Sequence, residues 1–369
     1  MNQRQRAGLA LPAAVFTLAV IMLFIAGSAF VTTQESRASL GAVTERLALE
    51  AAEYGAVAVL RDWNRAWNVT SPVGQTIGPI THTLAGGASS TVHLTRTTPT
   101  TWWVVSVGSA GGSSRRRVAV RTVNATFRLD LPPDAVDAAL GAADSARVLG
   151  GGVVIGTDSV EALAGCGLAT ANAGVAAPDT MRVCDGACGI AGSGIIGTPA
   201  LLADSTVTLR ATSITSAVTP DIVLPAGAIV TPSPVAIGSL CDTLAAANWG
   251  DPGGAGACRA YLPVISALGD LTVRGGTGQG IIVASGDVRF ENGAMFAGLV
   301  VAADDFLTGA GGGTVLGAVL AGDARRGTGD HTRIASGGIV RRASCRIRQA
   351  RLAAASPVRV RDRWWAEFD

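Results

Sequence analysis

Aspartate recurs at nearly fixed intervals in the C-terminal half of this sequence and is the first residue type to consider for chemistry. The steps between four copies are 17, 18 and 18 residues, in the phrases LGDLTV, SGDVRF, ADDFLT and AGDARR at Asp270, Asp287, Asp305 and Asp323. Such carboxylates could bind calcium or perform acid–base chemistry on a polysaccharide. Stacked acids repel unless they are paired or protonated, whereas a turn-capping aspartate needs only nearby backbone N–H groups. The pattern therefore favours a turn-forming role, with calcium binding and catalysis as alternatives.

Other residues that could perform chemistry are sparse. The chain contains no lysine, which excludes Schiff-base chemistry, and no histidine clusters with the aspartates. The phrases GGTGQG (275–280) and GAGGGT (309–314) lack the Gly-Lys-Ser/Thr ending of a phosphate-binding loop, and no GxSxG elbow occurs. We therefore predict that the protein is not an enzyme and needs no cofactor, with calcium left as the open alternative.

The elements that would position the aspartates are repeated as well. Apolar bursts accompany them, in GIIV from Gly280, GLVV from Gly298 and GAVL from Gly317. A period near eighteen residues with two short strands is typical of a β-solenoid, with Gly and Asp at the corners. We predict a mainly-β, right-handed solenoid-like domain over residues 132–340, with a cysteine-bearing insertion at 161–262. The phrase GGGVVIGTDSV (150–160) is interpreted as an earlier coil, with Asp158 at the equivalent corner.

The N-terminal segment predicts a membrane anchor. Arg4 and Arg6 precede an uncharged run from Ala7 to Gln34, which exceeds the roughly 20 apolar residues that a spanning helix needs. The flanking charges favour a cytoplasmic N-terminus, an inner-membrane span and export of the remaining chain. A cleaved secretory signal is the alternative, with GSA at 27–29 as a small-residue cleavage site.

Export makes disulfides the favoured state of the cysteines. Their number is even, and they are Cys166, Cys184, Cys188, Cys241, Cys258 and Cys345. No histidine stands at ligand spacing from a cysteine, so a metal site is not favoured. We predict the pairs Cys241–Cys258 and Cys166–Cys184, because each would close a short glycine-rich loop.

The remaining segments complete an α+β fold. Residues 1–67 predict one long helix whose second half is amphipathic, with an apolar stripe that packs on its own domain or on other copies in an assembly. That stripe comprises Leu40, Val43, Leu47, Tyr54 and Leu60. Residues 68–131 alternate as a small antiparallel sheet should. The basic tail, 341–369, predicts a short helix at 344–355 and a cap over the solenoid end.

Composition and net charge limit the kinds of partner that we expect. Charged residues make up 15% of the chain and the formal net charge is +2, so no global charge favours nucleic acid as a partner. Glycine is present in 48 copies, which suits strands joined by tight turns.

The N-terminal segment RAGLALPAAVFTLAVIMLFIAGSAF, followed by TQESRAS, resembles the PilX-type segment of pilus-assembly proteins. The later phrases NWGDP, GDLTV, GGTGQGIIV and the final RWWAE resemble larger exported proteins that carry such a segment. The resemblance implies a minor pilin or assembly factor of a type IV pilus, with other pilins and the inner membrane as partners. It also implies prepilin cleavage between Gly8 and Leu9. The sequence departs from the prepilin pattern because Ala13 stands where a glutamate is expected.

Three functional hypotheses follow from these observations. The leading one is a non-enzymatic, membrane-anchored minor pilin whose N-terminal helix packs into a filament or assembly complex and whose solenoid is displayed outside the inner membrane. The second is a surface adhesin or ligand-binding module. The third is a solenoid enzyme that acts on polysaccharide through the aspartates.

Overall fold

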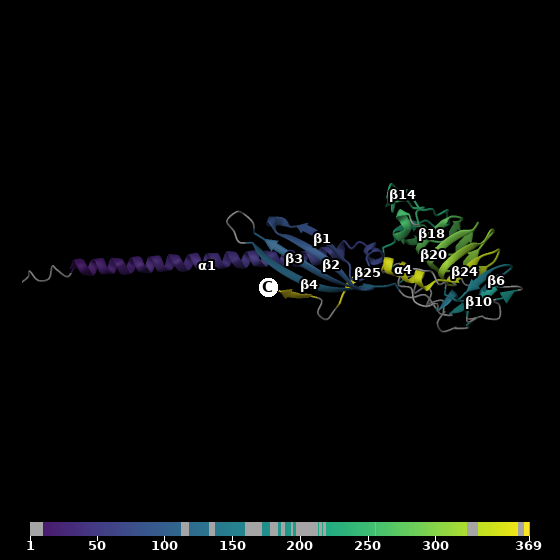
Figure 1. Ribbon diagram of the computed structural model, residues 1–369, viewed down its shortest axis with the longest axis horizontal. Coiled ribbons are helices and arrows are strands. Elements are labelled where there is room, and N and C mark those ends of the chain that lie inside the picture. The colour runs from purple at the N-terminus through teal and green to yellow at the C-terminus, as the bar shows by residue number, and fades with distance from the viewer. Residues whose placement is uncertain are drawn as a thin grey trace, which may run out of the picture.

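The computed structural model describes residues 10–111, 118–132, 137–158, 172–177, 184–185, 189–192, 195–196, 213, 216, 219–254, 256–322, 331–360 and 365–368. Along its longest axis a single long helix leads into an antiparallel sheet, and a region of mainly parallel strands follows (Figure 1). The fold therefore combines a long N-terminal apolar helix with a large, mostly-strand portion that contains both antiparallel and parallel sheets.

Helix α1 (Ala10–Arg61) is continuous over 52 residues. Its sequence is rich in alanine and leucine, and Pro12 lies in the first turn, where a proline interrupts no helical hydrogen bond. Up to Leu47 nearly all of its side chains are exposed, whereas from Ala48 onward one face is buried. A four-residue helix, α2 (Trp67–Thr70), follows it.

The buried face of α1 lies unusually close to the antiparallel sheet because both surfaces carry small side chains. A Cβ added to Gly108 of the sheet would lie 2.0 Å from the Ala48 carbonyl oxygen. A Cβ added to Gly55 of the helix would lie 2.5 Å from the Ser90 Oγ. Glycine at these two positions therefore permits a contact that no larger residue would allow without a backbone shift.

The antiparallel sheet has the order β1-β2-β3-β4-β25, and β26 also pairs with β4. Its strands are β1 (Thr76–Thr83), a short 3-10 turn η1 (Ala85–Gly87), β2 (Ser89–Thr98), β3 (Thr101–Ala110), β4 (Ala119–Asp130), β25 (Ser356–Arg359) and β26 (Trp365–Phe368). Burial alternates along β2 and β3, and Trp102 and Phe127 lie in the core beneath α1. The alternation predicted for residues 68–131 is confirmed, but the two C-terminal strands were not predicted.

The parallel strands form two sheets. The first has the order β10-β7-β24-β22-β20-β18-β16-β12, with β5, β8 and β11 off this path, and the second has the order β13-β17-β19-β21-β23-β6-β9. The first comprises β5 (Ala138–Ala142), β7 (Val153–Ile155), β8 (Ala173–Ala176), β10 (Gly189–Ala191), β11 (Ile195–Ile196), β12 (Ile222–Leu224), β16 (Val264–Ala267), β18 (Thr277–Ala284), β20 (Ala294–Ala302), β22 (Gly313–Ala321) and β24 (Ile339–Arg342). The second comprises β6 (Ala146–Leu149), β9 (Cys184–Asp185), β13 (Ala228–Val230), β17 (Leu271–Arg274), β19 (Val288–Glu291), β21 (Phe306–Thr308) and β23 (Thr332–Ile334).

From β16 to β24 the chain alternates between the two sheets, one strand in each. Ile281 pairs with Leu299 and Leu299 with Ala318, so neighbours along the first sheet are separated by about one predicted period. Buried side chains of both sheets, such as Phe290 and Phe296, share one hydrophobic core. The period near eighteen residues is therefore the spacing of paired strands. A hairpin of β14 (Ala236–Ile237) and β15 (Leu240–Cys241) and a 3-10 turn η3 (Ala257–Ala260) lie beside this region.

The order of strands corrects one prediction. The stretch around β7 pairs with β24 and β10, so it follows the last strand of the repeat in space and does not precede the first. Asp158 does not occupy a corner equivalent to the other aspartates; its Oδ1 accepts a hydrogen bond from the Ser344 N–H at 2.8 Å, at the start of α4. A carboxylate there complements the positive end of the helix dipole.

The structure of the C-terminal tail corrects a second prediction. Helix α4 (Ser344–Ala354) forms where a helix was predicted, but it packs across the face of β18, β20 and β22, with Ile347 and Ala350 buried against them. The chain then returns to the antiparallel sheet, where Ser356 pairs with Asp130 (Figure 1). The predicted cap over a sheet end is therefore wrong, because α4 covers a face and the tail extends a different sheet. The parallel sheets are an insertion between β4 and β25.

Candidate functional site

The first half of α1 is an apolar surface that none of the other described residues covers. Eleven large apolar side chains between Leu11 and Val31 are each more than half exposed, including Phe16 at 71% and Phe24 at 73%. Burying such a surface is worth about 25 cal/mol per Å². The helix is long and apolar enough to cross a membrane.

The second half of α1 carries a narrower apolar stripe. Its members are Leu40, Val43, Leu47, Tyr54 and Val57, all exposed. Their steps of 3, 4, 7 and 3 residues match the a and d positions of a heptad, the spacing by which one helix packs against another. Four of the five residues of the predicted stripe are thus exposed, and Leu60 instead packs against the core under the sheet. The alternative in which the whole stripe packs on its own domain is wrong for Leu40, Val43 and Leu47. Tyr54, although exposed, also contacts His82 of β1 edge to face.

The corner aspartates bind the neighbouring turn of the chain. The Oδ1 of Asp270 accepts a hydrogen bond from the Asp287 N–H at 3.0 Å, and the Oδ1 of Asp287 accepts one from the Asp305 N–H at 3.2 Å. The Oδ1 of Asp305 in turn accepts from the Thr332 hydroxyl at 3.3 Å. These carboxylates join successive strands of the second parallel sheet, which a local turn-capping role did not predict. Asp323 lies outside the described residues.

Three carboxylates at this corner lie close together. Oxygen atoms of Asp287, Asp304 and Asp305 lie within 4.8 Å of one another, and the last two residues are buried. All three residues already have polar partners in the chain. The printed hydrogen bonds of Asp287 and Asp305 hold successive turns of the chain together.

One predicted disulfide is present. Cys241 and Cys258 are bonded, with their Cα atoms 4.8 Å apart. Cys345 at the start of α4 is also disulfide-bonded. The predicted pair of Cys166 with Cys184 involves Cys166, which lies outside the described residues, as do Gly8 and Leu9 of the predicted cleavage site.

Sequence reasoning missed the importance of Asn248 beside the disulfide. Its fully buried side chain donates to the Asp242 carbonyl oxygen at 2.6 Å and to the Val235 carbonyl oxygen at 3.0 Å, which holds the β14–β15 hairpin against the following turn. The neighbouring Trp249 is buried against Phe296 in an edge-to-face contact. The phrase NWGDP was the signal that could have indicated both residues.

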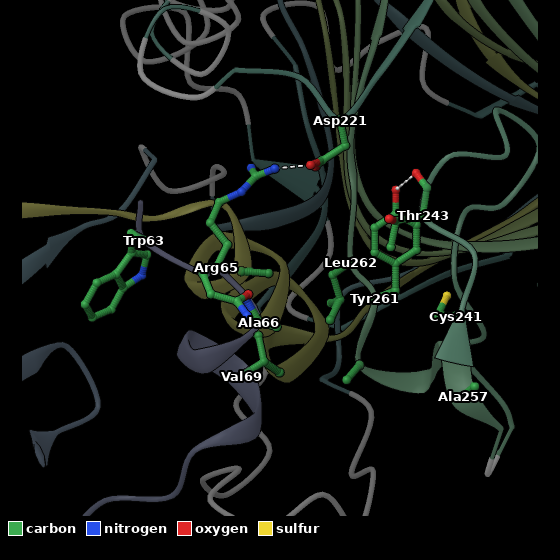
Figure 2. A pocket seen from close by; sticks show the side chains of 13 residues that line it. Trp63, Arg65, Ala66, Val69, Asp221, Cys241, Thr243, Ala257, Tyr261 and Leu262 are labelled. Carbon is green, nitrogen blue, oxygen red and sulfur yellow. Dashed lines mark hydrogen bonds and ion pairs between the residues drawn. The ribbon is translucent and has the colours of Figure 1, made fainter. Parts of the chain in front are cut away.

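A pocket of about 390 Å³ lies where the connection from α1 to α2 meets the parallel-sheet region (Figure 2). Trp63, Arg65 and Val69 line one side, and Asp221 and Tyr261 line the other. An ion pair between Arg65 and Asp221 crosses it. The pocket is therefore part of the joint between the two regions.

The charged wall of this pocket is fixed from the parallel-sheet side. The second carboxylate oxygen of Asp221 accepts a hydrogen bond from the Val264 N–H at 2.8 Å, at the start of β16. Burial raises the pKa of the Tyr261 hydroxyl to about 12, and the nearby negative charge of Asp221 adds to this shift. Tyr261 therefore stays protonated at neutral pH and donates to the Thr243 carbonyl oxygen over a long 3.4 Å (Figure 2).

Comparison with known proteins gives little beyond this geometry. No model of a known protein family matches the chain, and no curated protein matches its sequence. Among solved structures, the crystal structure of the competence-associated pilin ComZ from Thermus thermophilus is similar at 11% sequence identity and a TM-score of 0.25. That match covers 88% of this chain and 97% of the other. Likeness at this level shows neither a shared fold nor a shared function.

Proposed function

We propose that this protein is a non-enzymatic, membrane-anchored pilin-like subunit of a type IV pilus-like system, of the PilX-type minor pilins that its N-terminal segment resembles. The first half of α1 would span the inner membrane with its N-terminus in the cytoplasm. The second half would pack against helices of other pilins or assembly proteins. The parallel sheets would form a β-solenoid that is displayed beyond the membrane.

The observation that carries this proposal is the division of α1 into three surfaces. The first half is apolar and exposed, one face of the second half is buried on the antiparallel sheet, and another face of the second half carries the exposed stripe Leu40, Val43, Leu47, Tyr54 and Val57. A helix that only anchored the domain would not need the stripe. A heptad-spaced stripe continuous with a membrane-spanning segment fits a partner that is also a helix and also begins in the membrane.

The corner aspartates support the non-enzymatic part of the proposal. The carboxylate oxygens of Asp270 and Asp287 accept hydrogen bonds from backbone N–H groups of the next turn, and these bonds hold neighbouring strands together. A carboxylate oxygen that already accepts a backbone hydrogen bond is less available to contact a substrate.

The test is a pair of aspartate substitutions on α1 in the full-length chain in its native cells. Leu47→Asp places a charge in the stripe, whereas Ala42→Asp places the same charge on an exposed face of the helix outside it. We expect Leu47→Asp to abolish co-purification with other pilins from detergent-solubilised membranes, because burying a leucine is worth about 1.5–3 kcal/mol and a buried charge costs more. Ala42→Asp should preserve it.

Membrane fractionation serves as the control. Both variants should remain in the membrane fraction, since neither alters the segment from Leu11 to Val31. The proposal fails if Leu47→Asp co-purifies with the same partners as the unmodified protein, or if the unmodified protein is recovered without any other subunit that carries an apolar N-terminal helix.

A further inference from the structure

The outer face of the second parallel sheet carries a row of arginines. Arg289 pairs with Leu307, Leu307 with Arg333, and Arg333 with Arg147, so the four residues occupy one register position on β19, β21, β23 and β6. The residues on either side of each arginine along its strand are buried, so the side chains of Arg289, Arg333 and Arg147 point to the outer side of the sheet. Leu307, which lies between Arg289 and Arg333, is itself buried at 4% exposure.

Arg147 and Arg333 of this row are not neutralised in the way that the neighbouring Arg274 is. Two residues after Arg289 on β19, Glu291 lies opposite Arg274 of β17 and forms an ion pair with it at 3.3 Å. Arg333 and Arg147 instead lie directly opposite each other, and neither has an ion-pair partner among the described residues. Like charges opposite each other on neighbouring strands destabilise a sheet. The fold therefore gains nothing from this arrangement, which points to an anionic partner outside the chain.

The spacing of the row defines the shape of that partner. Neighbouring strands lie about 4.8 Å apart, so Arg333 and Arg147 are one such step apart and Arg289 is two steps from Arg333. The row crosses the strands in a straight line, and 44% of the Arg289 side chain is exposed at one end of it. Arginine binds carboxylates with two parallel hydrogen bonds. An extended chain with carboxylates at intervals of several ångströms fits this geometry.

We propose that the outer face of the second parallel sheet binds an extended acidic polysaccharide through Arg147, Arg333 and Arg289. Nucleic acid fits less well. No aromatic side chain occupies the row, so bases have no stacking platform, and Glu291 lies beside Arg289 with its carboxylate 4.0 Å from the guanidinium. A duplex carries one negative charge per 1.7 Å and would meet that acid, whereas sparser carboxylates need not. This inference stands independently of the pilin-like role.

The experiment measures binding of the full-length protein in detergent micelles to immobilised polygalacturonate by biolayer interferometry. The matched ligand control is the same polymer with its carboxylates methyl-esterified. The charge-loss variant is Arg147→Gln/Arg333→Gln, and the protein control is Arg128→Gln/Arg259→Gln, which removes two exposed arginines from other surfaces. Thermal unfolding of each variant checks that it is folded.

We expect binding to polygalacturonate that weakens with added salt, and none to the esterified polymer. Arg147→Gln/Arg333→Gln should weaken binding at least about tenfold, since hydrogen bonds to charged groups are the stronger class, while the control variant binds as the unmodified protein does. If the glutamine variant does not fold, Arg147→Lys/Arg333→Lys keeps the charge and should still weaken binding through loss of the paired hydrogen bonds. Equal binding to the ester, no effect of the folded variants, or binding to duplex or single-stranded DNA without binding to polygalacturonate would each overturn the proposal.

Discussion

The antiparallel sheet and the parallel sheets are built from contacts of opposite kinds. From β16 to β22 of the parallel region, each strand pairs with one that lies about eighteen residues away, as Ile281 does with Leu299. In the antiparallel sheet the edge is completed by strands from the far end of the chain, as Ser356 pairs with Asp130. The first kind of contact closes short loops at small entropic cost, and the second requires the insertion to bring its two ends together.

The two regions also differ in what limits their packing. The antiparallel sheet is covered by α1 through small residues on both surfaces, and side chains of α2 and α4 complete its core. The parallel sheets share a core of large side chains and are limited instead by how closely consecutive backbones approach. Substitutions should therefore destabilise the two regions for different physical reasons, and hydrogen exchange can locate the destabilised region.

The largest effect is expected in the parallel region, at Gly298. This residue pairs with Gly280 and has φ +143°, and an added Cβ would lie 2.0 Å from the Gly280 carbonyl oxygen. Gly298→Ala should therefore lower the free energy of unfolding by about 3 kcal/mol or more. Hydrogen–deuterium exchange should increase across β18, β20 and β22 while β2 and β3 remain protected.

The matched control is Gly293→Ala in the adjoining turn. Gly293 also has positive φ, at +71°, but no atom lies within 4 Å of the added Cβ. Gly293→Ala should therefore lower the free energy of unfolding only by the penalty for positive φ at alanine, about 1–2 kcal/mol. Equal destabilisation by the two variants would mean that backbone approach does not limit the parallel region.

The joint between the two regions should show the next largest effect, at Asn68. Its buried side chain accepts from the Trp63 Nε1–H at 3.0 Å and donates to the carbonyl oxygens of Leu352 and Ala355, each at 2.9 Å. Asn68→Ala leaves these groups without partners, at a cost of about 2 kcal/mol in the free energy of unfolding measured by denaturant titration. Exchange should increase at the end of α4 and in β25.

Asn64→Ala provides the comparison at the joint. Asn64 accepts only a local bond from the Ala66 N–H at 3.0 Å and is exposed, so its loss should cost well under 1 kcal/mol and leave β25 protected. If both variants have the same small effect, the hydrogen bonds of Asn68 do not stabilise the joint.

A smaller effect is expected at the aspartate corner. Asp287→Ala removes the acceptor for the Asp305 N–H and should lower stability by about 1–2 kcal/mol. Asp287→Asn retains an Oδ1 acceptor and should cost less, which thermal unfolding can measure. If the asparagine variant is as unstable as the alanine variant, the negative charge itself is needed and a cation at the corner would have to be reconsidered.

The sequence predicted what is local and periodic. The spacing of the aspartates and of the apolar bursts predicted the strand pairing from β16 to β22, the alternation predicted the antiparallel sheet, and loop length predicted the Cys241–Cys258 bond. It did not predict that the tail completes the antiparallel sheet, because nothing in a short basic segment specifies a partner strand more than two hundred residues away. The role of Asp158 was missed for the same reason, since its bond to Ser344 joins distant segments.

The arginine row was missed although each arginine is plain in the sequence. Arg147 precedes Arg333 by about half of the chain, and only the unexpected placement of β6 beside β23 makes them neighbours. The eighteen-residue period predicted that the segment containing β6 and β7 precedes the first coil of the repeat. In that position Arg147 would lie beside different residues. A candidate site built from non-consecutive turns therefore depends on strand order, which local pattern does not determine.

The smallest effect concerns Tyr261 at the joint, and it appears only at alkaline pH. Burial raises the pKa of this hydroxyl to about 12, against about 10 in an unfolded chain. Between these values the unfolded state loses the proton and the folded state keeps it, so the stability that is intact below pH 10 falls as the pH rises toward 12. Tyr261→Phe removes this term, and its stability should fall less between pH 9 and pH 11 than that of the unmodified protein. An unchanged slope in Tyr261→Phe would mean that the joint opens before the core of either region at alkaline pH, because a solvated Tyr261 would titrate as it does in the unfolded chain.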